Sequence, residues 1–599
     1  MNENLALASP SDRVSAACRL VTQSRLDDAD MLLREVLTRQ PQDPWALNAL
    51  GGIALLRQDM EAARRLIGAA ATIRPDEPEI LANLAGLHSQ RGAADEALIC
   101  LERAVTLAPG HAGIRRQHAE LLLSLSRVEE AADEAQRSLE LDPDSVGTWV
   151  TRGLVAIAQS DPRLAIACFR EATQLDEACV AAWHNLAELH ARGRDTAEAL
   201  RCAERAYLAA PGSPVQLVAF ARQLAEADPE RAQGLVRRAL ALAPADLQAI
   251  ELAARLDLMR GADRKAFSDL AACVRQSGKD PAALLALARV LGVAGRFAQA
   301  LQSIEEALAQ APDSSEARAL RKECLLSLGR FDAVADGAEA LPRDIAGVVI
   351  PATMPIGEII LAARFLPRLA EGRAAALPVV AHPGIAPLLA GLPQIILTDE
   401  GPHASPEALL MPEIMARLRV NAVTDGAAVP YLIPDTERTE AWRRVLAALP
   451  GPRIGILWHP GQQGIGLSCL VEAARALGTP LSLAVGGLRA ELEAFPDVID
   501  AGAAIAEPQD LLAAVATLDI VVAPDSLAAH LAGALGRPAL VFVPAGRHWA
   551  WAEREGRGIW YPSVDVLTQA KPGDWSDVLA RLPISLAARL AEMASDGQP

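Results

Sequence analysis

The 599-residue sequence predicts an α-helical repeat solenoid followed by a two-lobed α/β domain with parallel sheets. Two observations carry this fold class. A helix-end pattern recurs in steps of about 34 residues through residues 1–341. Prolines then interrupt the helical rhythm, and short β-branched runs begin to alternate with helical stretches. With 51% apolar and 22% charged residues, the chain has the composition of a folded globular protein.

The helix-end pattern is an apolar helix terminus followed by a proline or an acidic residue. It occurs at Pro41, Pro75, Pro109, Pro143, Glu177, Pro211, Pro244 and Pro312. Two helices in each unit of this length are typical of tetratricopeptide (TPR) repeats. One helix pair cannot bury its apolar face alone, so neighbouring pairs stack and share a core. Residues 1–341 therefore resemble a TPR superhelix of about nine helix pairs.

A line of polar residues accompanies the repeats. A polar side chain stands eight residues after each of four successive helix ends, at Asn83, Gln117, Thr151 and Asn185. Amide side chains both donate and accept hydrogen bonds, so such a line can hold an extended peptide by its backbone. The pattern resembles the asparagine ladder in the TPR region of O-linked N-acetylglucosamine transferases. The alternative is that these residues are ordinary solvated groups of the concave face.

Beyond the linker, two blocks of alternating strands and helices occupy residues 345–433 and 453–590. Apolar strands that alternate with helices indicate parallel sheets covered on both faces. The two blocks predict two lobes with a cleft between them.

One junction in the second block carries polar residues, within "VVAPDSLAAHLAGALGRPALVFVP". Asp525 and Ser526 follow a buried strand at its carboxyl end, where open α/β sheets bind ligands. Ser526 is a natural helix N-cap, and the free backbone N–H groups of the helix start suit a phosphate. His530 lies one turn further on and can face the same ligand. The alternative is a capped helix with a buried histidine.

The segment "PDSLAAHLAGALGRPALVFVP" resembles the donor-binding segment of GT-B glycosyltransferases of the heptosyltransferase clan. The stretches "PIGEIILAARFLP" and "RIGILWHPG" and a tryptophan-rich tail extend the likeness to the TPR-fused bacterial branch of that clan. The resemblance implies a GT-B domain that needs no metal, with an acceptor-side lobe at 345–433 and a nucleotide-sugar lobe at 453–590. It places the donor phosphates beside Asp525, Ser526 and His530.

The same resemblance assigns residues in both lobes. Glu358 falls on an acid that looks like the general base toward the acceptor hydroxyl, although it can also simply favour its helix start. Trp458, His459 and Gly461 fall on the first loop of the donor lobe. There His459 can contact phosphate or stabilise the leaving group, or be a plain loop histidine.

One departure from the clan bears on the donor. Its basic loop, which grips a diphosphate, is replaced by "HPGQQGIGLSCL", which contains no Lys or Arg. Cationic side chains make the strong charge-assisted contacts to phosphate. The loss therefore favours a nucleoside monophosphate donor, such as a CMP-activated sugar, unless His459, His548, Arg547 or Arg453 substitutes.

These observations predict a cytoplasmic protein O-glycosyltransferase that moves a sugar from a nucleotide donor to Ser or Thr of a polypeptide held by the TPR arm. The layout resembles bacterial flagellin glycosyltransferases, which transfer a nonulosonic acid such as pseudaminic acid. Flagellin is accordingly the expected partner. Two alternatives stand beside this one: a TPR scaffold with a degenerate transferase domain, and a glycan-directed transferase for lipopolysaccharide or capsule.

Bulk properties limit the other classes. A net charge of −18 argues against nucleic acid as a partner, and no apolar stretch is long enough to span a membrane. The eight cysteines are scattered without metal-site spacing, as in a reducing compartment. We expect no metal and no cofactor other than the nucleotide-sugar co-substrate.

Overall fold

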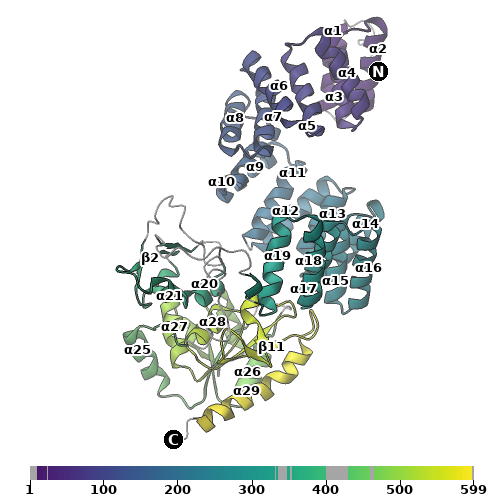
Figure 1. Cartoon of the computed structure of the whole chain (residues 1–599). Helices are drawn as coiled ribbons and strands as arrows, with labels where there is room; N and C mark the ends of the chain where they lie inside the picture. Colours follow the sequence, from purple (N-terminus) through teal and green to yellow (C-terminus); the bar gives the residue numbers. More distant parts are fainter. Residues whose placement is uncertain are drawn as a thin grey trace. The chain divides into compact units, whose positions relative to one another are not determined.

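The computed structural model describes residues 10–22, 25–193, 195–330, 332–334, 347–350, 354–382, 384–398, 429–458 and 464–596. The chain forms two compact units, Met1–Leu235 and Val236–Pro599. Both the repeats and the α/β part are recognisable in Figure 1 by their elements.

The first unit consists of antiparallel helix pairs. The first helix of successive pairs begins at Pro44, Pro78, Ala112, Val146, Val180 and Pro214, a constant step of 34 residues that confirms the predicted period. The helices that lie in this unit or cross its end are α1 (Pro10–Thr22), α2 (Leu26–Arg39), α3 (Pro44–Leu56), α4 (Met60–Ile73), α5 (Pro78–Gln90), α6 (Ala94–Leu107), α7 (Ala112–Ser124), α8 (Val128–Leu141), α9 (Val146–Ala158), α10 (Pro162–Leu175), α11 (Val180–Arg192), α12 (Thr196–Ala209), α13 (Pro214–Leu224) and α14 (Pro229–Leu242).

Local sequence sets the ends of these helices. Asp43 caps α3 by accepting a hydrogen bond from the Ala46 N–H, and Pro44 occupies the first helical position, where no N–H is needed. Asp59, Ser145 and Asp161 cap other helices in the same way. The repeat length therefore follows from recurring caps and prolines.

Small residues let the two helices of a pair approach closely. Gly153 of α9 faces Phe169 of α10, and a Cβ at position 153 would lie 2.6 Å from the phenyl ring. Phe169 is fully buried, so its ring occupies the space that a side chain at 153 would need. The pairing of a small residue with a large one fixes the helix separation at this repeat.

The second unit contains the last repeats and the α/β part. Its remaining repeat helices are α15 (Leu247–Met259), α16 (Asp263–Gln276), α17 (Pro281–Val293), α18 (Phe297–Gln310) and α19 (Ser315–Ser327). A 3-10 turn, η2, follows at Asp332–Val334. The predicted boundary at residue 341 lies outside the described residues, between η2 and the first strand at Val348, whereas the division between compact units lies within the repeats.

The α/β part has a three-stranded parallel sheet, in the order β1-β2-β3, and an eight-stranded sheet. Its strands are β1 (Val348–Val349), β2 (Leu377–Val380), β3 (Ile395–Leu397), β4 (Arg453–Ile456), β5 (Thr479–Ser482), β6 (Ile499–Asp500), β7 (Ile520–Pro524), β8 (Ala539–Val543), β9 (Glu553–Arg554), β10 (Arg557–Gly558) and β11 (Val564–Thr568). Its helices are α20 (Ile356–Ala363), α21 (Leu366–Ala370), α22 (Ala386–Leu389), α25 (Thr436–Leu446), α26 (Leu467–Arg475), α27 (Pro508–Thr517), α28 (Leu527–Ala534) and α29 (Ser576–Asp596), with 3-10 helices η3 (Gly486–Ala494), η4 (Ala501–Ala504) and η5 (Trp549–Trp551).

The larger sheet has the strand order β6-β5-β4-β7-β8-β11-β10-β9. Its first six strands pair in parallel and follow the doubly wound order in which the chain runs outward from the middle in both directions. The order reverses between β4 and β7. Strands β9 and β10 add an antiparallel hairpin at one edge, so the expectation of purely parallel sheets holds for six of its strands only.

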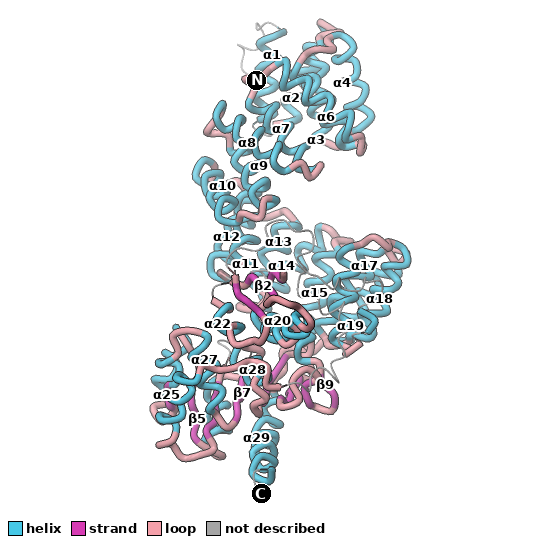
Figure 2. Tube along the Cα trace, turned by 60° about the vertical axis from the view of Figure 1, so that its left-hand side comes forward, coloured by secondary structure: helices cyan, strands magenta, loops and turns pink. Residues whose placement is uncertain are grey.

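Alternate strand residues face two separate helical layers. Val521 and Ala523 of β7 belong to the core beneath α27 and α28, whereas Ile520 and Val522 belong to the core beneath α26 and α29. All five residues of β7 are buried. Figure 2 shows β5 and β7 of this sheet (magenta) among the surrounding helices.

A single hydrophobic core joins the described parts of the two α/β blocks, and the expected cleft between two lobes stays a prediction. Six of the eight residues of α20, from the first block, are buried, and this helix packs on α28 of the second block. A helix as apolar as α20 needs a partner surface, and α28 supplies it. The described residues do not establish a GT-B arrangement.

The Gly153–Phe169 contact predicts opposite stability effects for two glycine-to-alanine substitutions. Gly153→Ala should destabilise the protein by about 1–3 kcal/mol, because the new methyl group overlaps the Phe169 ring. Gly68→Ala in α4 is the matched control, since a Cβ there meets no atom within 4 Å. Helix propensity should make that variant more stable by about 1 kcal/mol. Urea unfolding followed by circular dichroism measures both, and an unchanged Gly153→Ala midpoint would contradict the packing.

Candidate functional site

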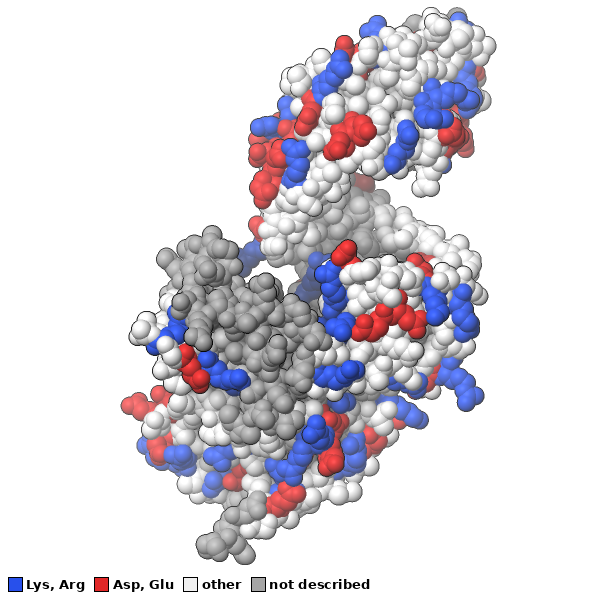
Figure 3. All heavy atoms as spheres, in the orientation of Figure 1, with Lys and Arg blue, Asp and Glu red and all other residues white. Residues whose placement is uncertain are grey.

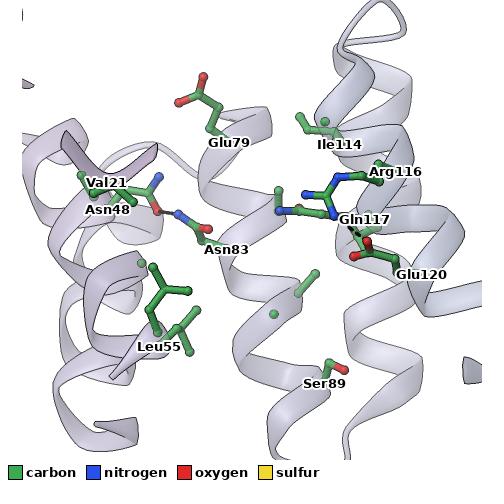
Figure 4. Close-up of a pocket in the computed structure, with 18 of the residues that line it drawn as sticks. Val21, Asn48, Leu55, Glu79, Asn83, Ser89, Ile114, Arg116, Gln117 and Glu120 are labelled. Carbon is green, nitrogen blue, oxygen red and sulfur yellow. Dashed lines mark hydrogen bonds and ion pairs between the residues drawn. The ribbon is translucent and has the colours of Figure 1, made fainter. Parts of the chain in front are cut away.

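A groove of about 800 Å³ lies in the first unit, between α1, α3, α5 and α7. Figure 4 shows polar side chains from three of these helices pointing into it, among them Asn83 of α5 and Gln117 of α7. The apolar part of its lining includes Val14, Val21 and Leu55. The groove therefore offers amide groups beside apolar contacts, as an extended polypeptide requires.

The structure brings together the first two residues of the predicted polar line. Asn83 and Gln117 both line the groove. The Nδ2 group of Asn83 donates to Oδ1 of Asn48 at 3.1 Å, so Asn48 begins the line. The Oε1 atom of Gln117 is buried without a hydrogen-bond partner among the described residues. An occupant with an N–H group would satisfy that oxygen.

The other two predicted members do not contribute to this groove. Thr151 is 1% exposed, and its hydroxyl is within hydrogen-bond distance of Glu120 Oε1 (2.9 Å) and the Gly147 carbonyl (3.0 Å). Asn185 donates to the carbonyl of Ala181 in its own helix. Of the predicted line, this groove thus contains Asn83 and Gln117, together with Asn48. The prediction missed Asn48 because it stands 35 residues before Asn83, one residue more than the 34-residue repeat.

Charged residues at the rim of the groove carry both signs. Arg116 is paired with Glu120 of the same helix, and Glu79 also lines the groove. Acidic and basic side chains are likewise interspersed over the face of the molecule shown in Figure 3. This groove lacks the single-sign basic surface typical of nucleic-acid binding.

A second cluster lies in the α/β part and consists of two carboxylate–imidazole pairs, Glu358–His548 and Asp525–His530, called here the paired-acid site. In the first pair, His548 Nε2 lies 2.9 Å from Glu358 Oε1. The Ala550 N–H donates to Nδ1 of the same imidazole, so the ring proton of neutral His548 must reside on Nε2. His548 therefore donates to Glu358. Both side chains are partly exposed, at 31% and 20%.

In the second pair, Nε2 of His530 lies 3.2 Å from Asp525 Oδ1, and Nδ1 lies 3.0 Å from the Tyr561 hydroxyl. Burial raises the pKa of the Tyr561 phenol well above its ordinary value, so the phenol keeps its proton. Burial alone would raise the pKa of the Asp525 carboxyl, but the hydrogen bond and charge of His530 outweigh it and lower that pKa. Asp525 is thus an anion, and the His530 imidazole stabilises its carboxylate by a hydrogen bond.

The two pairs meet where α20 packs on α28. A Cβ at Gly357 would overlap the His530 imidazole, so this position tolerates only glycine. The ring of Trp551 also lies against that imidazole, with centroids 4.5 Å apart. Glu358 directly follows Gly357, and the packing therefore brings it to the same region as Asp525.

Ser526 fulfils its predicted role as the N-cap of α28. Its Oγ accepts a hydrogen bond from the Ala529 N–H at 3.3 Å. Asp525 precedes it at the carboxyl end of β7, beside the point where the strand order reverses. In doubly wound sheets, ligands bind at this position.

Several predicted ligand contacts look different in the structure. His530 is 3% exposed and both of its ring nitrogens are engaged, so it supports Asp525 and does not face a ligand itself. Trp458 is 2% exposed and packs in the core beneath α26 and α29. His459 and Gly461 lie outside the described residues.

The structure also places three of the residues predicted to replace the cations of the missing basic loop. Both ring nitrogens of His548 are used in the pair with Glu358. Arg547 Nε donates to the carbonyl of Trp551. Arg453 begins β4 and lies at the opposite end of that strand from the ligand edge. Only the predicted substitute His459 is left untested, because it is not described.

Sequence reasoning missed His548 as the partner of Glu358, and Tyr561 and Trp551 as the supports of His530. No local signal could have found the first pair, because 190 residues separate its members. Tyr561 and Trp551 belong to the tail that carries the family resemblance, but their contact with His530 depends on tertiary packing. Among the described residues, no three His, Cys, Asp or Glu side chains form a metal-binding group.

Comparisons with known proteins identify the repeats. Residues 14–78, 83–146 and 150–214 match one tetratricopeptide repeat family, and residues 293–347 match another. The first part of the chain is therefore a TPR solenoid. Within the described part of the chain, no helix is long and apolar enough to cross a bilayer.

Relatives outside the repeat families are distant. Protein FlbA of Caulobacter vibrioides is 26% identical over 198 residues, which cover 29% of this chain and 32% of FlbA. The chain thus spans about a third of that relative. A solved structure of the APC/C hetero-tetramer Cut9–Hcn1 matches 40% of this chain and 48% of its own, at 20% identity and a TM-score of 0.36. Pseudomonas aeruginosa pilF matches 34% of this chain and 94% of its own, at 20% identity and a TM-score of 0.31.

The lowered pKa of Asp525 predicts a pH-dependent stability difference between wild type and Asp525→Asn. A carboxyl whose folded pKa is depressed stabilises the fold above its unfolded pKa, about 3.9, and loses that contribution as pH falls through the folded value. Wild type should therefore melt above the variant at pH 7, and the gap should close at about pH 3 and below. Differential scanning fluorimetry across this range measures it. Asp313→Asn, at a fully exposed turn, is the control, and a constant gap would contradict the assignment.

Proposed function

We propose that the chain is a protein O-glycosyltransferase in which the TPR groove holds the acceptor polypeptide and the paired-acid site transfers the sugar from a nucleotide donor. The observation that carries the proposal is the placement of Asp525 and the start of α28 at the point of strand-order reversal of a doubly wound sheet. Such edges bind nucleotides in many α/β proteins. The family resemblance of the same segment supports the choice of glycosyl transfer.

The chemistry of Asp525 limits what it can bind. Its side chain is 45% exposed, and its carboxylate is ionised and acceptor-only. An anion repels phosphate, so we assign Asp525 to hydroxyl groups of the donor's sugar or ribose. The donor phosphate would instead lie against the backbone N–H groups at the start of α28, where the helix dipole favours negative charge.

Glu358 is the candidate general base. Its Oε1 is held by His548, whereas Oε2 has no hydrogen-bond partner among the described residues. In the proposed step, the acceptor hydroxyl oxygen forms a bond to the anomeric carbon of the sugar while the bond from that carbon to the phosphate oxygen breaks. The hydroxyl proton passes to Glu358 Oε2, and the nucleotide leaves with its phosphate.

A donor of low charge fits the described surroundings best. Arg364, a cation behind the site, is 6% exposed and donates to the carbonyls of Leu361 and Trp560, so it cannot reach a phosphate. Arg547 donates its Nε–H to the Trp551 carbonyl and has one terminal nitrogen 3.8 Å from Glu553 Oε1, so part of its charge is already balanced. A CMP-activated sugar has a single phosphate to hold, and we therefore propose a CMP-linked nonulosonic acid, whose sugar carries a carboxylate of its own, as donor and flagellin as acceptor.

The shortage of free cations among the described residues around the site also favours a second candidate function, a TPR scaffold whose α/β domain binds no sugar nucleotide. Calorimetric titration with CMP and UDP separates the two candidates. We expect CMP to bind, and Asp525→Ala to weaken binding of the intact CMP-sugar about tenfold or more through loss of a charge-assisted hydrogen bond. If neither nucleotide binds, the scaffold is favoured. If sugar is transferred to a purified glycan and not to protein, the glycan-directed alternative stands.

The groove predicts acceptor binding that depends on amide side chains. Asn83→Ala combined with Gln117→Ala should weaken binding of purified host flagellin about tenfold or more, because two backbone contacts are lost. Nucleotide binding should not change. Asn185→Ala is the matched control, since this asparagine bonds its own helix. Fluorescence anisotropy with labelled flagellin measures the effect, and equal affinity of all three proteins would exclude this groove as the acceptor site.

A further inference from the structure

The loop that carries His548 touches the TPR solenoid backbone to backbone. This loop, residues 544–548, joins β8 to η5. A Cβ at Gly295, in the turn between α17 and α18, would lie 2.5 Å from the Ala545 carbonyl oxygen. In the other direction, a Cβ at Gly546 would lie 2.7 Å from the Val293 carbonyl oxygen. Neither position has room for a side chain, so the two glycines permit a direct contact.

Two neighbouring contacts hold the same edge of the larger sheet. Helix α19 packs against η5, which begins directly after His548. Gly573, in the segment after β11, approaches the carbonyl oxygen of Met259 at the end of α15, where a Cβ would lie 2.9 Å away. The last repeats thus contact loops that follow two adjacent strands.

These contacts of the last repeats bear on both carboxylate–imidazole pairs of the paired-acid site. His548 stands at the end of the loop and donates to Glu358. Trp551, at the end of η5, lies with its ring tilted against the ring of His530, the support of Asp525. A shift of η5 and its loop would therefore displace a support of each carboxylate.

We propose that His548 is a positioning residue for Glu358 and that the last TPR repeats, through Gly295, are a structural part of the paired-acid site. The catalytic consequence rests on the proposed function, whereas the geometry of the His548 side chain does not. His548 fixes one oxygen of Glu358 and leaves the other available to the acceptor hydroxyl. Deletion of the whole solenoid would then disable the chemistry as well as acceptor capture.

A pair of glycine variants in the full-length protein tests the contact between Gly295 and the loop that carries His548. Gly295 and Gly278 both lie in turns after repeat helices with positive φ, 71° and 67°, so alanine strains both backbones equally. Only Gly295 faces a neighbour, because a Cβ at Gly278 meets no atom within 4 Å. Gly295→Ala should lower kcat for sugar transfer about 10²-fold relative to Gly278→Ala, with the KM for flagellin unchanged. Equal kcat values for the two variants would overturn the proposed role of Gly295 and the last repeats.

Variants of His548 test the positioning role. His548→Ala should lower kcat without changing the KM for flagellin, and His548→Gln should recover part of the loss, because an amide N–H can replace the imidazole donor. A kcat of His548→Ala equal to that of wild type overturns the role. So does a His548→Gln variant no better than His548→Ala.

A spectroscopic measurement keeps the inference separate from the proposed function. In protein labelled with ¹⁵N-histidine, the resonances absent from His548→Gln identify His548. We expect the Nε2–H tautomer in wild type and in Gly278→Ala, and a shifted or averaged signal in Gly295→Ala. An Nδ1–H tautomer, or a Gly295→Ala spectrum identical to wild type, overturns the inference. The expected spectra in a protein that transfers no sugar would instead defeat only the proposed function.

Discussion

The contact between Gly357 and the His530 imidazole is the constraint on which the paired-acid site depends. Because position 357 has no side chain, α20 can lie directly on α28. That packing places Glu358, at the start of one helix, near Asp525, which precedes the other. Each carboxylate then has its own imidazole, and each imidazole has a fixed partner on its second nitrogen. Two acids with separate supports can perform separate tasks.

Features encoded over short distances were predictable from the sequence. The repeat period, the helix starts at Pro44 and Pro78 and the Ser526 cap all depend on residues within one or two helical turns. The strand–helix alternation gave the α/β class for the same reason. The strand order was not predictable, since it depends on which strands pair across the sheet, and so the reversal between β4 and β7 emerged only from the structure.

The candidate site was predictable only where its members are neighbours in sequence. Asp525, Ser526 and His530 lie within six residues, yet the burial of His530 depends on Gly357 from another block. The strict repeat also does not match the set of residues that line the groove. Thr151 follows the period, but its hydroxyl bonds within the protein, while Asn48 departs from the period and faces the groove. Periodicity indicates a helix face and does not decide which side chains remain free on it.

The hydrogen bond between Asn48 and Asn83 affects how tightly the groove can bind a peptide. Asn83 donates one N–H to Asn48 and keeps its second N–H and its carbonyl oxygen for an incoming backbone. The unsatisfied oxygen of Gln117 is the place where a net gain is available. The Asn48–Asn83 bond therefore holds one wall of the groove in place, and Gln117 is where the proposed peptide would gain most.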